Sequence, residues 1–142
     1  MPFVHIETNQ TVDAATSAAI VSAVTDLVAK VKPEVEKRGI AVSLHHGCVL
    51  GFGGDATTPA VVINVTNATM PHEVTLPLTQ GLTAIAMQNY GADPLRIYCF
   101  FHELKELYLC GIMGVTFQEL GAAAARPNAS PAAPPETTPS QS

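Results

Sequence analysis

The sequence predicts an α+β fold in which two β-α-β units form one mixed sheet with two helices on one face. The main observation is that the order strand, helix, strand occurs twice within residues 1–120, and each half, roughly 50–60 residues, is long enough for a crossover unit. A second observation is composition, since apolar residues make up 47% of the chain and charged residues 13%. So little charge is unusual for a small monomer, so we expect the uncovered sheet face to be buried by other subunits.

The first β-α-β unit is predicted over residues 1–45. A run of apolar and β-branched residues in Met1–Glu7 indicates a strand that begins at the second residue. Apolar residues then recur at helical spacing over Val12–Val31, with Thr11 as the expected N-cap. Pro33 ends this helix at Lys32, and alternation over Ile40–His45 predicts the next strand.

The second unit is predicted to follow a glycine-rich turn, Gly47–Asp55, which lacks the lysine of a phosphate loop and indicates a hairpin with tight backbone packing. A helix is expected over Val74–Tyr90, starting close to Pro77 and ending at Gly91. The expected strands are Ala60–Val65 and Leu95–Phe101, with short edge strands at Leu107–Leu109 and Met113–Phe117.

Residues 1–120 therefore form the predicted domain, and residues 121–142, rich in Ala, Pro, Ser and Thr, are predicted to be a disordered tail. The net charge of −5 argues against nucleic acid as a partner, and no apolar run is long enough to predict a membrane span. No secretory signal is apparent, so we expect a cytoplasmic protein. The three cysteines include no paired motif, and His102–Glu106 lacks the second histidine of a zinc helix, so we expect no metal site.

Pro2 has two interpretations. Proline is tolerated where a strand starts, because no N–H is needed there for the ladder. Alternatively, a small second residue permits removal of Met1, which would leave a free secondary amine at the start of a core strand.

Beyond these patterns, the chain resembles the macrophage migration inhibitory factor and D-dopachrome tautomerase branch of the tautomerase superfamily. The residues that carry the resemblance span most of residues 1–120 in the family's order. They are Met1-Pro2, Lys32-Pro33, Phe52-Gly53-Gly54 with Pro59, Asp93–Tyr98 and Thr116-Phe117.

The resemblance implies a cofactor-free isomerase: a homotrimer with active sites between neighbouring subunits. Pro2 would be the general base for keto–enol tautomerisation of phenylpyruvate-like or dopachrome-like substrates. An α-amine titrates near 7.7–8.0, and burial near a lysine would lower the pKa of the Pro2 amine so that it is neutral near pH 7.

The resemblance also assigns substrate-binding positions. Lys32 would attract the substrate carboxylate, although a lysine at a helix C-terminus also simply complements the helix dipole. Tyr98 would line the pocket, or be an ordinary strand tyrosine with its hydroxyl at the surface. The remaining implied positions are Ala68, Phe100, Ile112 and Phe117. Ala68, Phe100 and Ile112 replace the isoleucine, asparagine and tryptophan of many members, so we expect a pocket of different shape and lower polarity.

Two other functions stay open. The chain could be a cytokine-like ligand of a protein receptor, released without a signal peptide, whose pocket is incidental. Dehalogenation or hydration would need arginines near the substrate, and the chain has only Arg38, Arg96 and Arg126.

Overall fold

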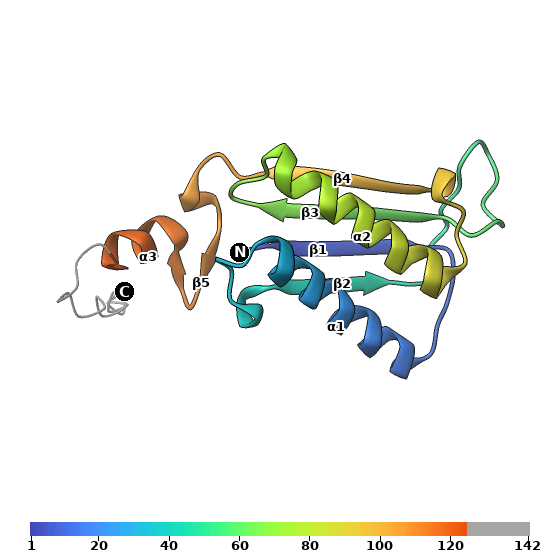
Figure 1. Cartoon of the computed structure of the whole chain (residues 1–142), viewed down its shortest axis with the longest axis horizontal. Helices are drawn as coiled ribbons and strands as arrows, with labels where there is room; N and C mark the ends of the chain where they lie inside the picture. The colour runs from blue at the N-terminus through green and yellow to red at the C-terminus, as the bar shows by residue number, and fades with distance from the viewer. Residues whose placement is uncertain (125–142) are drawn as a thin grey trace, which may run out of the picture. The chain divides into compact units, whose positions relative to one another are not determined.

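The structure, a computed structural model, describes residues 1–124, and the side chains of residues 1–121. These residues divide into two compact units, one of Met1–Lys105 and one that begins at Glu106. The first unit holds a four-stranded sheet in the order β2-β1-β3-β4, with two helices side by side over one face (Figure 1). This confirms the predicted α+β fold class.

The sheet is built from two parallel pairs joined in the middle. β1 (Phe3–Thr8) pairs in parallel with β2 (Ala41–His45), and β3 (Val61–Asn67) pairs in parallel with β4 (Ile97–Glu103). β1 and β3 run antiparallel at the centre, with Phe3 opposite Thr66 and Thr8 opposite Val61. Because β3 runs opposite to β1, the end of β3 lies beside the start of β1.

The helices α1 (Ala14–Val31) and α2 (His72–Tyr90) cover the apolar face of the sheet. Val4, Ile6, Ile63 and Val65 of the central strands are essentially inaccessible, as is Ile20 of α1. Gly81 of α2 allows close contact between the helices, because a Cβ there would come within 2.5 Å of Leu27 Cδ1. By length and composition α1 could cross a membrane, but this test is also passed by core helices, and Ile20 buries one side of α1 in this core.

Several predicted boundaries were wrong. α1 is capped by Asp13, whose side chain accepts from Thr16 N–H at 2.7 Å, rather than by Thr11. α2 begins at His72, well before Pro77, so Pro77 lies inside the helix, where it cannot donate the usual hydrogen bond to Glu73 O. β4 continues through His102 to Glu103, beyond the predicted end at Phe101.

The glycine-rich turn is a minimal hairpin, as predicted. Phe52 and Asp55 exchange two backbone hydrogen bonds of 3.1 Å, and Gly53 and Gly54 between them have φ values of 60° and 83°. Positive φ at both central positions matches the twist of a two-residue hairpin and favours glycine. Arg96 fixes the turn by donating to the carbonyl oxygens of Phe52, Asp55, Thr58 and Pro59.

The second unit contains a small hairpin and a helix. β5 (Gly111–Ile112) pairs with β6 (Val115–Thr116), and α3 (Phe117–Ala124) follows directly. Leu107–Leu109 forms a 3-10 turn rather than the expected strand. α3 includes the first residues of the predicted tail, and the rest of that tail lies outside the described residues.

Candidate functional site

The start of β1 places Pro2 at the centre of one end of the sheet. Pro2 is less than 2% exposed, and its carbonyl accepts from Ala41 N–H at 3.1 Å, which extends the β1–β2 pairing by one residue. Its side chain falls on the helix-covered face, in step with Val4 and Ile6. The residue that the resemblance implies to be the base is therefore buried, at the edge of the helix-covered core.

α1 brings Lys32 to the same end of the sheet. Lys32 is the C-cap of α1, and its N–H donates to Val28 O at 2.8 Å. Its Nζ donates to Thr69 O at 3.0 Å and lies 3.3 Å from Glu34 Oε1. The Lys32 side chain is only 7% exposed, whereas that of Glu34 is 64% exposed, so the ammonium lies nearly buried with its counterion at the surface.

The end of β3 completes this cluster. Asn67, 2% exposed, accepts from the amino-terminal amine of Met1 at 3.2 Å through Oδ1, and its carbonyl accepts from Leu104 N–H at 2.8 Å. Ala68 lies between Asn67 and the Thr69 carbonyl that Lys32 contacts. Three of the predicted residues, Pro2, Lys32 and Ala68, are thus brought together within one unit.

Tyr98 and Phe100 lie elsewhere on the sheet. They point to the face opposite the helices and are 53% and 47% exposed, while Cys99 and Phe101 between and after them pack on the core. Tyr98 stacks edge-on against Phe52 with ring centroids 4.8 Å apart, and against Phe100 at 5.8 Å. Within one copy of the chain they are on the other side of the sheet from the Pro2 side chain.

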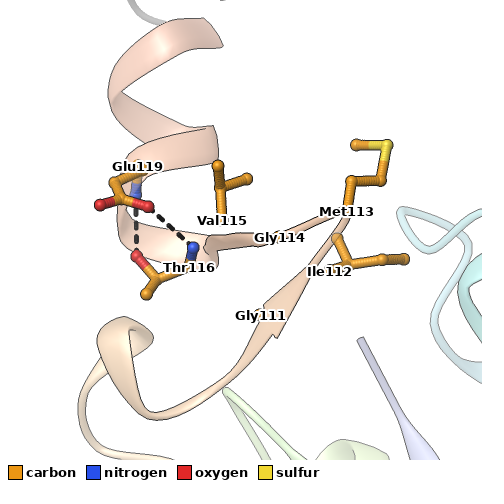
Figure 2. Close-up of a pocket in the computed structure, with 7 residues that line it drawn as sticks. All are labelled: Gly111, Ile112, Met113, Gly114, Val115, Thr116 and Glu119. Atoms are coloured by element: carbon orange, nitrogen blue, oxygen red, sulfur yellow. Dashed lines mark hydrogen bonds between the residues drawn. The ribbon is translucent and has the colours of Figure 1, made fainter. Parts of the chain in front are cut away.

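Ile112 and Phe117 belong to the second unit. Ile112 lines an open hollow of about 590 Å³ formed by residues 111–116 and Glu119 (Figure 2). Thr116 N–H donates to Glu119 Oε2 at 2.9 Å and Glu119 N–H lies 3.4 Å from Thr116 Oγ1, so these polar groups cap α3. Among the apolar side chains around the hollow, Met113 is 80% exposed. Phe117 begins α3.

Sequence reasoning missed Asn67 and Glu34. The signal for Asn67 was present, because alternation along β3 puts it on the buried face after Val61, Ile63 and Val65. No sequence pattern marks Glu34, because its role depends on where the fold places the Lys32 ammonium. The hydrogen bond from its own N–H and then the Lys32 ammonium hold the pKa of Glu34 below its ordinary value.

Other reactive side chains do not join this cluster. His102 Nε2 is 2.8 Å from Asn64 Oδ1 on the outer sheet face. Burial raises the pKa of the Cys99 thiol, which makes it a poor nucleophile. Among the residues described here, no group of three or more His, Cys, Asp or Glu is placed to hold a metal.

The class of protein is an α+β fold: a mixed four-stranded sheet made of two β-α-β units, with two paired helices on one face. No family model matches the chain, and no curated protein matches it either. Solved structures do match, and several of them are of macrophage migration inhibitory factor proteins. The homologue from Prochlorococcus marinus is 20% identical with a TM-score of 0.73, and the match covers 81% of this chain and 98% of that one.

Two further solved structures are similar to this chain in fold. The macrophage migration inhibitory factor of Toxoplasma gondii is 18% identical with a TM-score of 0.73, covering 80% of this chain and 98% of that one. Pt0534, whose structure was determined after inactivation by 2-oxo-3-pentynoate, is 16% identical with a TM-score of 0.74, covering 84% and 98%. The resemblance predicted from the sequence is confirmed, and at these identities it is the fold that is shared.

Proposed function

We propose that this chain is a cofactor-free keto–enol tautomerase of phenylpyruvate-like α-keto acids, with Pro2 as general base once Met1 is removed. The observation that carries the proposal is a fully buried Pro2 at the same end of the sheet as the nearly buried ammonium of Lys32. A secondary amine in apolar surroundings near a cation has a lowered pKa, because both conditions disfavour its protonated form. Pro2 would then be a neutral base near pH 7.

The reaction moves one proton between carbon and oxygen. The Pro2 nitrogen takes a proton from the carbon beside the ketone, and the C–H electron pair forms the enolate C=C bond while the ketone oxygen gains charge. The resulting Pro2 ammonium then gives the proton to that oxygen, which yields the enol and restores the neutral amine. Lys32 would hold the substrate carboxylate and orient the substrate for this transfer.

In this proposal, Tyr98 and Phe100 of a neighbouring subunit line the site. The outer sheet face exposes Phe3, Tyr98 and Phe100, each by more than 40%, and a second copy is the occupant proposed for it. A homotrimer would thereby supply these aromatic walls, together with Ile112 and Phe117, to sites between subunits.

The proposal is tested by determining the mass of the amino terminus and then comparing phenylpyruvate tautomerisation by wild type and Pro2→Gly. We expect Met1 to be absent, and kcat/KM to fall about 10²–10⁴-fold in the variant, the usual contribution of a general base. Pro59→Gly is the matched control, because Pro59 also precedes a strand but lies at the other end of β3. Retained Met1, or equal rates for wild type and Pro2→Gly, would contradict the proposal.

The alternative is a cytokine-like interaction protein, released without a signal peptide, whose pocket is incidental. One observation favours it: Val49 is 98% exposed and Leu95 85% exposed, on segments that the Arg96 side chain ties together. Rigid exposed apolar side chains are suited to contacting another protein. Wild-type protein without measurable turnover, but with receptor binding that Leu95→Ser abolishes and Pro2→Gly leaves intact, would favour this alternative.

A further inference from the structure

Asn67 is a polar residue at a position where the fold calls for an apolar one. Val61, Ile63 and Val65, which precede it on the same face of β3, are all completely buried, and Asn67 itself is 2% exposed. A buried amide without hydrogen bonds destabilises the folded state, a cost that a valine would avoid. The amide is therefore expected to have a specific partner.

The partner of Asn67 is the beginning of the chain. Its Oδ1 accepts from the amino-terminal amine of Met1 at 3.2 Å. Phe3 pairs with Thr66, so extending the β1–β3 register by one residue sets Pro2 opposite Asn67. Both side chains lie on the helix-covered face, where directly opposed residues have Cβ atoms about 4.5–5.5 Å apart.

We propose that Asn67 is a positioning residue for the Pro2 amine: after Met1 is removed, Asn67 Oδ1 accepts a hydrogen bond from the protonated Pro2 nitrogen. This inference rests on the proposed function, in which Pro2 is the base. A protonated secondary amine carries two hydrogens. One would be held by Asn67 Oδ1, which leaves the other aimed at the substrate oxygen for return.

The hydrogen bond has a measurable consequence. An acceptor for the charged form favours that form, so Asn67 raises the pKa of Pro2 above the value that burial and Lys32 alone would give. Asn67 would thus keep Pro2 basic enough to remove a proton from carbon, while the apolar surroundings keep it neutral before the reaction.

Other charged groups also face this end of the sheet. Nearest are Lys32 with its partner Glu34, and Glu103 at the end of β4, whose Oε2 accepts from Met70 N–H at 2.9 Å. The exposed pairs Lys37–Asp26 and Arg38–Glu36, and His72 and Glu73 in the first turn of α2, lie on the neighbouring segments. All are unchanged by substitution at Asn67, so differences between variants report on residue 67.

The test uses 2-oxo-3-pentynoate as a probe of the Pro2 nitrogen in the processed full chain. A neutral amine adds to the alkyne carbon conjugated with the ketone, which forms an N–C bond, and its proton moves to the adjacent carbon. The labelling rate therefore follows the neutral fraction of Pro2, and its dependence on pH gives the pKa of Pro2 without requiring turnover. The labelled residue is identified by mass spectrometry of peptides.

We expect the midpoint of labelling to move down by about one pH unit in Asn67→Ala, because the acceptor is lost. In Asn67→Asp, which has the same shape, we expect it to move up by about one unit, because a carboxylate favours the ammonium. Asn89→Ala is the matched control, since the Asn89 side chain donates to Ile85 O within the last turns of α2, and it should leave the midpoint unchanged. Opposite shifts in two variants at one position cannot come from loss of folding.

Labelling at Pro2 with the same midpoint in all four proteins would overturn the role of Asn67 and leave the proposed function intact. If Asn67→Ala does not fold, the test rests on Asn67→Asp. A labelling midpoint in Asn67→Asp equal to that of wild type then overturns the inference. A wild type that is not labelled at Pro2 would overturn the proposed function, and the role of Asn67 with it.

Discussion

Lys32 and Glu34 show how a few atoms set the properties of the candidate site. The Lys32 ammonium is nearly buried and has two partners in the structure, Thr69 O and Glu34 Oε1. Thr69 O is a fixed backbone acceptor, whereas Glu34 is mostly exposed and can turn to solvent at little cost. A substrate carboxylate that binds Lys32 must therefore compete with Glu34.

Glu34→Gln should lower KM for phenylpyruvate about two- to fivefold and leave kcat unchanged, because it removes the charge that competes with the substrate carboxylate for the Lys32 ammonium. Steady-state kinetics on wild type and variant measure this. Glu36→Gln is the control, since Glu36 pairs with exposed Arg38 rather than with Lys32. An unchanged or higher KM in Glu34→Gln would contradict this role.

Lys32→Ala should raise KM about ten- to one-hundredfold, the effect of losing a charged hydrogen bond to the substrate. Lys30→Ala removes the same charge from the exposed side of the last turn of α1 and should change KM little. An unchanged KM in Lys32→Ala would leave Lys32 as a helix-terminal cation only.

At the scale of elements, periodicity predicted the core strands and helices, and it failed where other interactions decide the ends. Asp13 rather than Thr11 caps α1, because the Asp13 side chain is the one that reaches the free Thr16 N–H. The end of β4 was missed because pairing with β3 carries His102 and Glu103 into the sheet, against their polar character. Pro2 and Lys32 could be found from the sequence. Alternation along β3 marks Asn67 as buried, but its partner, like the place of Glu34 beside Lys32, depends on which parts of the chain meet in the fold.

The far end of the sheet is tied by a contact between elements. Tyr90, the last residue of α2 and 4% exposed, has its hydroxyl 2.8 Å from His46 Nε2 in the loop after β2. Burial raises the pKa of Tyr90 to about 12 from an ordinary value of 10.0. The folded state thus favours the neutral phenol, so this contribution is present below pH 10 and is lost as pH rises through about 12.

Tyr90→Phe should lower the free energy of unfolding by about 1 kcal/mol at neutral pH, through loss of the His46 hydrogen bond. It should also flatten the decline in stability between about pH 10 and 12. Urea denaturation of wild type and variant across this range measures both effects. Tyr108→Phe, which changes a 56% exposed tyrosine, is the control, and an equally steep decline in Tyr90→Phe would contradict the assignment.

At the scale of the whole molecule, one copy of the chain does not complete the predicted site. Pro2, Lys32 and Ala68 meet at one end of the sheet, while Tyr98 and Phe100 lie on its opposite, uncovered face. We infer that another copy of the chain covers the aromatic residues on this sheet face, and the low charge of the chain agrees with this inference. Association of copies would therefore be a condition for activity.

Light scattering after size exclusion should accordingly give the mass of a trimer. Phe100→Lys, which places a charge on the outer sheet face, should shift the mass toward the monomer and reduce tautomerisation in parallel, although Pro2 and Lys32 are untouched. Met87→Lys, on the exposed side of α2, is the control for an added charge. A wild type that is monomeric and fully active would contradict the shared site.

The central claim, that the amine of Pro2 is the base, is tested most directly on one preparation of the chain that is produced without methionine aminopeptidase, so that Met1 is kept on purpose. Phenylpyruvate tautomerisation is measured before and after treatment with a methionine aminopeptidase, and intact mass follows the removal of Met1. The account predicts that kcat/KM rises at least about 10²-fold in proportion to the processed fraction, because an amide nitrogen cannot accept the proton that a free amine can. Equal activity before and after removal of Met1 would contradict it.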